Sequence, residues 1–238
     1  AGYAYNVQFE IVEVDSGSGE GTVAADGATT LSSSGVIAVV GAAGSSASMA
    51  ANAVLSAAGI PMISYASTSP TLSDSTTYPH FYRVVPSDAI QGPALADVVA
   101  DRGSTDPCLI AMDNAYGTDF AAAFRADWEA TNGALTADIS YAADSTSLAS
   151  QAQAIVEAGC DSVVAISYPA DGAILLADLN TAGFTGAIYG GDGIAETGLC
   201  SGLSDISLCD GVVATKPADG TASDRSQAFA LLCSQSPD

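Results

Sequence analysis

Basic side chains are scarce in this chain of 238 residues. It carries five Lys and Arg against 27 Asp and Glu, with a formal net charge of -22 at pH 7. Nucleic acids and anionic membrane surfaces both require Lys and Arg to neutralise phosphates, so the charge balance argues against both partners. A densely acidic surface is typical of a protein from a salty habitat, where ions screen the self-repulsion. A specific cationic partner is the other interpretation.

Long apolar runs are also missing. The stretch Gly27 to Ser73 contains no charged residue, but glycines and serines near Gly41 interrupt it. The apolar runs on either side are too short to cross a bilayer of about 30 Å. Residues 35–63 therefore predict a buried strand–helix–strand unit. Because 48% of the residues are hydrophobic and 13% are charged, we expect a folded chain.

The motifs of common catalytic and metal sites are absent from the sequence. There is one histidine, His80, and no CxxC pair, so we expect no metal site. GxSxG, GxxxxGK[ST] and GxGxxG do not occur, which argues against a serine hydrolase, an NTPase and an NAD-dependent enzyme. The sequence thus predicts a protein without catalytic activity and without a cofactor.

Five cysteines are present in this acidic chain, at positions 108, 160, 200, 209 and 233. They fit an oxidising compartment in which disulfides form. An odd number leaves one cysteine for a partner outside this chain. Buried free thiols in a cytosolic protein are the alternative.

Strand and helix patterns alternate along the chain. Strands are expected at 7–14, 36–40, 61–64, 82–85, 108–112, 135–141, 162–167, 187–190 and 211–215. Helices are expected at 22–34, 47–58, 88–102, 116–132, 148–158, 170–182 and 226–233. Repeated β-α units form parallel sheets covered on both faces, and the rhythm restarts near Thr105. The sequence therefore predicts an α/β fold with two doubly wound lobes.

Polar residues follow the predicted strands, at the sheet edge where open α/β folds bind ligands. In the first half, Ser45 and Ser46 end a glycine-rich turn just before a predicted helix, and Ser67 and Thr68 follow the next strand. Hydroxyls and free backbone N–H groups at a helix start suit an anion such as a carboxylate. A helix cap and a turn are the alternative roles.

The second half offers the opposite chemistry. Tyr116, Tyr168 and Asp192 each follow a predicted strand. A carboxylate and aromatic faces suit an ammonium group, so the two halves together would suit a zwitterion such as an α-amino acid. A core-edge tyrosine and a turn aspartate are the alternatives.

The order of these motifs resembles type I periplasmic binding proteins of the leucine/isoleucine/valine class and related receptor ectodomains. The matching segments are Gly35–Gly41 with Gly44-Ser-Ser, Ala58–Ser64 with Ala66–Pro70, Phe81–Asp88 with Gln91-Gly92, Tyr116-Gly117, and Gly190–Gly193. The resemblance runs over nearly the whole chain. It implies two lobes joined by a hinge, with a ligand cleft between them.

The resemblance also implies a function. Such a protein captures a branched-chain or related amino acid outside the cytoplasm, in the periplasm or at the cell surface, with a lipid anchor as one option. Closure of the hinge presents the ligand to a membrane ABC permease. A sensory receptor ectodomain and a structural surface protein with the same fold are the alternatives.

Roles for individual residues follow from the same resemblance. The loops containing Ser45, Ser46, Ala66, Ser67 and Thr68 are expected to hold the ligand's carboxylate. The side chains expected to hold its ammonium group are Tyr116, Tyr168 and Asp192.

The resemblance further sets domain boundaries and disulfides. Residues 1–86 would form a first lobe without the family's first β-α unit, and 87–238 a second lobe, with the crossing near 85–105. The family's return to the first lobe would follow Asp238. As a hypothesis, Cys108 pairs with Cys160 at the start of neighbouring strands. Cys200 would then close a short loop with Cys209, which leaves Cys233 for a partner.

Overall fold

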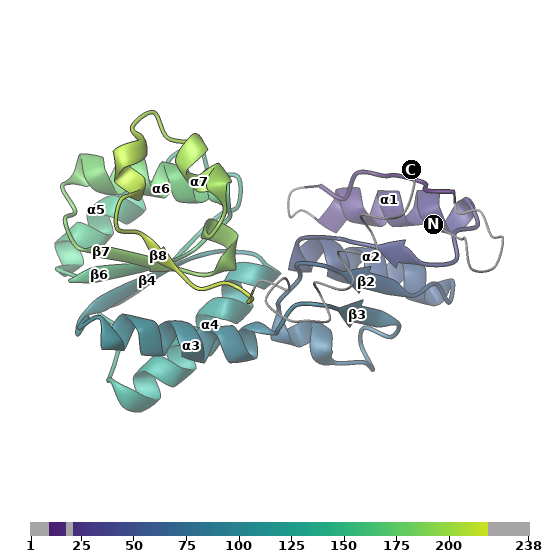
Figure 1. Cartoon of the computed structure of the whole chain (residues 1–238), viewed down its shortest axis with the longest axis horizontal. Coiled ribbons are helices and arrows are strands. Elements are labelled where there is room, and N and C mark those ends of the chain that lie inside the picture. Colours follow the sequence, from purple (N-terminus) through teal and green to yellow (C-terminus); the bar gives the residue numbers. More distant parts are fainter. Residues whose placement is uncertain (1–9, 18–20, 219–238) are drawn as a thin grey trace, which may run out of the picture.

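The computed structural model describes residues 10–17 and 21–218 as two parallel sheets with their helices (Figure 1). The strands are β1 (Val39–Val40), β2 (Met62–Ser64), β3 (Phe81–Arg83), β4 (Pro107–Met112), β5 (Ala137–Tyr141), β6 (Ser162–Ile166), β7 (Ala187–Gly190) and β8 (Val213–Ala214). The α-helices are α1 (Gly21–Ser33), α2 (Ser45–Ala57), α3 (Asp88–Asp101), α4 (Ala115–Thr131), α5 (Ala149–Ala158), α6 (Pro169–Ala182) and α7 (Thr197–Ser201). Short 3-10 turns are η1 (Pro70–Ser73), η2 (Asp192–Ile194) and η3 (Ile206–Cys209).

The second sheet forms a lobe with helices on both faces. Its strand order is β5-β4-β6-β7-β8, and every pair is parallel. Helices α5, α6 and α7 cover one face, and α3 and α4 cover the other (Figure 1). All six residues of β4 and all five of β6 are buried, as expected for strands covered on both sides. The predicted doubly wound arrangement is confirmed here.

The strand order contains a switch in direction. From β4 the chain moves to β5 on one side, and then crosses to β6 on the other side. The loops after β4 and β6 consequently lead to opposite faces of the sheet. Such a switch leaves an opening at the carboxyl ends of the two strands, where open α/β sheets bind ligands.

The first sheet, β1-β2-β3, is also parallel, but helices α1 and α2 pack on one face only. Val40, Ile63 and Tyr82 stand in register across the three strands on the opposite face. Their exposed fractions are 81%, 43% and 56%. The described residues therefore leave a row of apolar side chains uncovered, which is unusual for a parallel sheet.

The expected strand at 7–14 was wrong for the residues that the structure describes, because 10–14 form none. Ile11 is 82% exposed, and β1 pairs with β2 alone among the described residues. A pattern of alternating residues becomes a strand only where a neighbouring strand supplies hydrogen bonds. For the same reason, the strand expected at 36–40 is reduced to Val39–Val40. The helix expected at 226–233 lies outside the described residues.

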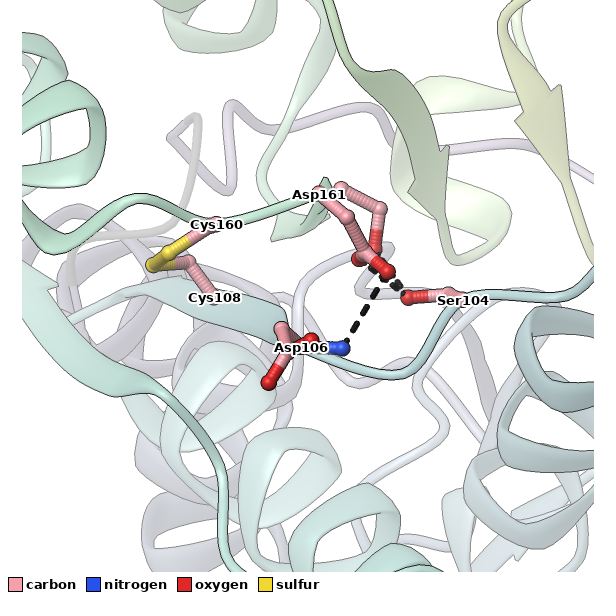
Figure 2. Close-up of a disulfide and its surroundings, with 6 residues drawn as sticks. Ser104, Asp106, Cys108, Cys160 and Asp161 are labelled. Atoms are coloured by element: carbon pink, nitrogen blue, oxygen red, sulfur yellow. Dashed lines mark hydrogen bonds between the residues drawn. A yellow bond between two sulfur atoms is a disulfide. The ribbon is translucent and has the colours of Figure 1, made fainter.

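Two disulfides lie in the second lobe. Cys108 at the start of β4 is joined to Cys160 before β6, with 5.7 Å between the Cα atoms (Figure 2). Cys200 is joined to Cys209, with 5.9 Å between the Cα atoms. These are the two pairs that the sequence analysis favoured, and Cys233 lies outside the described residues.

Beside the first disulfide, Asp161 links the segment before β6 to residues 104–106, which lead into β4 (Figure 2). Its carboxylate accepts hydrogen bonds from the Ser104 hydroxyl at 2.6 Å and from the backbone N–H groups of Thr105 at 2.7 Å and Asp106 at 3.2 Å. Burial alone would raise the pKa of Asp161, but these hydrogen bonds prevail and lower it.

Among the described residues, no helix is both long and apolar enough to cross a membrane.

Candidate ligand site at the junction of the two lobes

Tyr116, Tyr168 and Asp192 lie together at the carboxyl ends of β4, β6 and β7. The rings of Tyr116 and Tyr168 stack with centroids 5.2 Å apart and planes 9° apart. The Tyr116 hydroxyl donates to Asp192 Oδ1 at 3.0 Å and accepts from the backbone N–H of Gly193 at 3.0 Å. These contacts fix the carboxylate beside two aromatic faces, next to the switch between β4 and β6.

Glycines permit this close packing. A Cβ atom at Gly117 would lie 2.0 Å from the carbonyl oxygen of Met112, so a side chain would push the start of α4 off the end of β4. A Cβ atom at Gly193 would lie 2.4 Å from the Ser167 carbonyl oxygen and 2.9 Å from the Tyr116 hydroxyl. Both glycines are therefore required for Tyr116 to reach Asp192.

The first turn of α3 adds two residues that the sequence analysis did not select, Asp88 and Gln91. The Asp88 N–H donates to the Thr68 carbonyl oxygen at 2.9 Å, which ties α3 to the loop after β2. Residues three apart lie on one face of a helix, so Gln91 faces the same side as Asp88. Gln91 Nε2 donates to Asp192 Oδ1 at 3.3 Å and to the Thr215 carbonyl oxygen at 3.0 Å.

Several buried acceptor atoms of this junction have no hydrogen-bond partner among the described residues. They are both carboxyl oxygens of Asp88, the hydroxyl oxygen of Thr68 and the side-chain oxygen of Gln91. Asp88 and Thr68 are both fully buried. Buried polar atoms are normally hydrogen-bonded, and each unpaired one costs about 1–3 kcal/mol. A bound group that donates several hydrogen bonds would satisfy this set.

Two carboxyl groups of the junction, those of Asp88 and Asp192, resist ionisation. Burial, followed by the negative charge of Asp192, raises the pKa of Asp88 to about 8. The Thr68 hydroxyl and the Arg83 guanidinium act in the opposite direction, but neither makes a hydrogen bond of normal geometry to Asp88. Burial also raises the pKa of Asp192, against the hydrogen bond from Tyr116. A cation placed here would favour both ionised carboxylates.

The loops of the first lobe form a network of serine hydroxyls. Ser45 Oγ accepts from the Ser69 N–H at 3.2 Å, and Ser67 Oγ bonds Ser48 Oγ at 2.8 Å. Helix α2 begins at Ser45 without a side-chain cap, so its first N–H groups remain available to an anion. Arg83 Nη1 donates to the Ser69 carbonyl oxygen at 2.7 Å, which ties the loop after β2 to β3.

A groove of about 930 Å³ adjoins these loops at Ala42, Ala43 and Tyr65. It continues between residues 10–16 and 35–41, beside β1. Helices α1 and α2 line much of the remainder, so only the end of the groove at Ala43 and Tyr65 lies next to the serine loops.

Two hydrogen bonds join the serine loops to α4 of the second lobe. Ser46 Oγ accepts from the Ala115 N–H at 3.1 Å, and the Ser69 hydroxyl donates to the Asp119 carboxylate. Of the residues selected from the sequence, Ser45, Ser46, Ala66, Ser67 and Thr68 thus lie on the first-lobe side of one junction. Tyr116, Tyr168 and Asp192 lie on the second-lobe side.

Asp88, Gln91 and Asp119 lie within helices α3 and α4, whereas the sequence pattern pointed only to the residues that follow the strands. Asp88 follows Ser87, whose side chain accepts from the Ala89 N–H as the cap of α3. An acidic residue directly after a helix cap, at the crossing between two lobes, is the signal that could have found it.

Two lobes, each built on a parallel sheet with its helices, and polar side chains gathered at their junction define the architecture of a two-lobed solute-binding protein. The sequence profile described as "Periplasmic binding protein" matches residues 1–230. The chain therefore belongs to the periplasmic binding protein family.

Solved structures support the fold. The leucine-binding protein LivK from Thermotoga maritima superposes with a TM-score of 0.85 at 21% identity, over 95% of this chain and 64% of that protein. The branched-chain amino acid substrate-binding protein LivJ from Streptococcus pneumoniae, in complex with isoleucine, gives a TM-score of 0.68 at 29% identity. That match covers 77% of this chain and 52% of LivJ.

Receptors are similar over a shorter region. Metabotropic glutamate receptor 6 from Oryctolagus cuniculus is 47% identical over 89 residues, which is 37% of this chain and 10% of the receptor. Metabotropic glutamate receptor 8 from Homo sapiens is 44% identical over 86 residues. The chain thus spans a tenth of these receptors and less than two thirds of the solved binding proteins.

Proposed function

We propose that this protein captures a small zwitterionic ligand, a branched-chain or related amino acid, between its two lobes. Residues 1–86 would form one lobe and 87–238 the other, and hinge closure would bury the ligand. No covalent bond is made or broken in this function. The observation that carries the proposal is the set of buried acceptor atoms at Thr68, Asp88 and Gln91 that have no partner in the described part of the chain.

The ammonium group of the ligand would lie between α3 and the ends of β4, β6 and β7. An ammonium group has three donors and no acceptor, which matches a site made of acceptors. Asp88 and Asp192 would balance its charge, and the stacked rings of Tyr116 and Tyr168 would offer it an aromatic face.

The carboxylate would lie on the first-lobe side. The uncapped start of α2 offers backbone N–H groups and the positive end of the helix dipole. The hydroxyls of Ser45, Ser46, Ser67 and Thr68 would add donors, and Ala66 would pack beside them. The groove next to Ala43 and Tyr65 would receive the aliphatic side chain.

Delivery to a membrane ABC permease is the role we favour, in the periplasm or outside the cell, because LivJ is a transporter substrate-binding protein of this fold. A receptor ectodomain is the second candidate, favoured by the 47% identity with a metabotropic glutamate receptor. Cys233 would be available to a partner in either role.

A thermal-shift series tests both halves of the site. L-leucine, L-leucinamide, which lacks the carboxylate, and 2-hydroxy-4-methylpentanoate, which lacks the ammonium group, are compared with L-glutamate. L-leucine at 100 times its dissociation constant should add about 2.7 kcal/mol of stability, and the two analogues far less. Asp192→Ala should abolish the shift, whereas Asp97→Ala, an exposed change on α3, should not.

A shift with L-glutamate alone would favour the receptor candidate. No shift with any amino acid, from a folded protein, would refute the amino-acid proposal.

A further inference from the structure

Two carboxyl groups from different elements share the lobe junction. Asp88 lies in the first turn of α3, and Asp192 begins η2 after β7. Gln91 lies one turn after Asp88 on α3 and donates to Asp192 Oδ1 at 3.3 Å, so α3 contacts Asp192 close to Asp88. Asp192 has further donors, including Tyr116 at 3.0 Å, whereas both oxygens of Asp88 lack a partner among the described residues. Asp88 is therefore the member of the pair whose negative charge has no hydrogen-bond partner among the described residues.

The surroundings of Asp88 are mostly negative or neutral. The charged and titratable groups that influence it are Arg83 from β3, Tyr116 and Asp119 from α4, Tyr168 before α6, and Asp192 from η2. The single cation of this set, Arg83, gives hydrogen bonds to the carbonyl oxygens of Ser67 and Ser69. Burial and the charge of Asp192 accordingly raise the pKa of Asp88 to about 8.

We propose that Asp88 and Asp192 form a proton-exchange site, which holds a proton while no cation is bound and releases it when an ammonium group enters. The O–H bond of the carboxylic acid breaks, and the proton passes to water or a buffer base. The ammonium group keeps its three protons. The charge of the junction is the same before and after, because one bound positive charge replaces one proton.

Proton exchange makes binding depend on pH. Below the pKa of Asp88 at about 8, each ligand molecule that binds releases up to one proton. The apparent affinity for the ligand therefore increases by up to about tenfold for each unit by which the pH increases. The identity of the cation, an amino-acid ammonium group, rests on the proposed function. The claim that the ligand-free protein holds a proton at this site is independent of that function.

Carbon NMR of protein labelled with ¹³C at the aspartate carboxyl tests the proposal directly. Between about pH 4 and pH 10, one carboxyl resonance should titrate near pH 8, far above the ordinary aspartate value of about 3.9. It should be absent from Asp88→Asn and present in the control Asp97→Asn. In Asp192→Asn its midpoint should fall, because a neighbouring negative charge is removed.

Methylammonium chloride and L-leucine are then added separately, with sodium chloride at equal ionic strength as the reference. Either cation should lower the midpoint by about one pH unit or more. If every aspartate titrates in its ordinary range, or if neither cation moves the midpoint, the proposal is overturned. If methylammonium lowers the midpoint while no amino acid stabilises the protein, proton exchange stands and the proposed function fails.

Discussion

The hydroxyl oxygen of Ser46, on α2 of the first lobe, accepts a hydrogen bond at 3.1 Å from the N–H of Ala115, the first residue of α4 in the second lobe. A residue of one lobe thus completes the helix start of the other. Together with the contact between Ser69 and Asp119, it holds the lobes against each other beside the candidate site.

Ser46→Ala is expected to loosen this arrangement. One hydrogen bond contributes about 1 kcal/mol, so the equilibrium between closed and open lobes should shift about fivefold toward the open form. Small-angle X-ray scattering should show a larger radius of gyration. Ser56→Ala, later in the same helix, serves as the control, and equal scattering from the two variants would contradict this role of Ser46.

Tyr116→Phe and Tyr168→Phe form a matched pair, because both keep the stacked rings. Removing the Tyr116 hydroxyl leaves Asp192 Oδ1 and the Gly193 N–H each without one hydrogen bond, which should cost about 1–3 kcal/mol. The Tyr168 hydroxyl makes no hydrogen bond within the described residues, so its removal should cost less than about 0.5 kcal/mol. Urea unfolding measures both costs. Equal losses would argue against the bridging role of Tyr116.

Asp88 should weaken the ligand-free protein as pH rises. Its pKa is about 8 in the folded state and about 3.9 in the unfolded chain, so between these values the folded state binds more protons. The contribution of Asp88 to the free energy of unfolding is fully present below about pH 4 and is lost as the pH rises to about 8.

Asp88→Asn removes that loss. The variant should therefore gain stability over wild type on going from pH 5 to pH 9, on the order of 2 kcal/mol or more. Urea unfolding at the two pH values measures the gain, with Asp97→Asn as the control. Curves of wild type and Asp88→Asn that stay parallel with pH would contradict the buried, protonated carboxyl.

The two disulfides should contribute unequally. They close segments of 52 and nine residues, for which the loop-entropy relation gives about 4 and about 3 kcal/mol. Replacing Cys108 and Cys160 by Ala should lower the melting temperature more than the same change at Cys200 and Cys209. Calorimetry of the two double variants measures the difference, and the opposite order would refute the expectation.

Much of the second lobe could be predicted from the sequence because its signals are local. Buried strands such as β4 and β6 appear as short apolar runs, and Gly159 and Gly183 end helices in left-handed conformations at φ 75° and 84°. Parallel strands bring their carboxyl ends to one edge of the sheet, so the sequence alone predicts that Tyr116 and Tyr168 lie together.

The errors concern contacts between distant segments. Residues 10–14 alternate like a strand, but no pattern within them reveals whether a neighbour is present. Asp88 resembles an ordinary residue at a helix start, which is usually solvated. Its burial arises from the Thr68 loop, η2 and α4, which converge on it, and the local sequence shows only that Asp88 begins the helix at the crossing between the lobes.

Lys216 is the single lysine of the sequence, and it is exposed. It directly follows Thr215, whose carbonyl oxygen accepts the hydrogen bond from Gln91 at the lobe junction. Among the side chains of this sequence, an amine-reactive fluorophore would therefore attach at Lys216 alone, close to the candidate site. The scarcity of basic residues thus provides a natural attachment point for a fluorescent reporter of ligand binding. No cysteine needs to be introduced, so the two disulfides are left undisturbed.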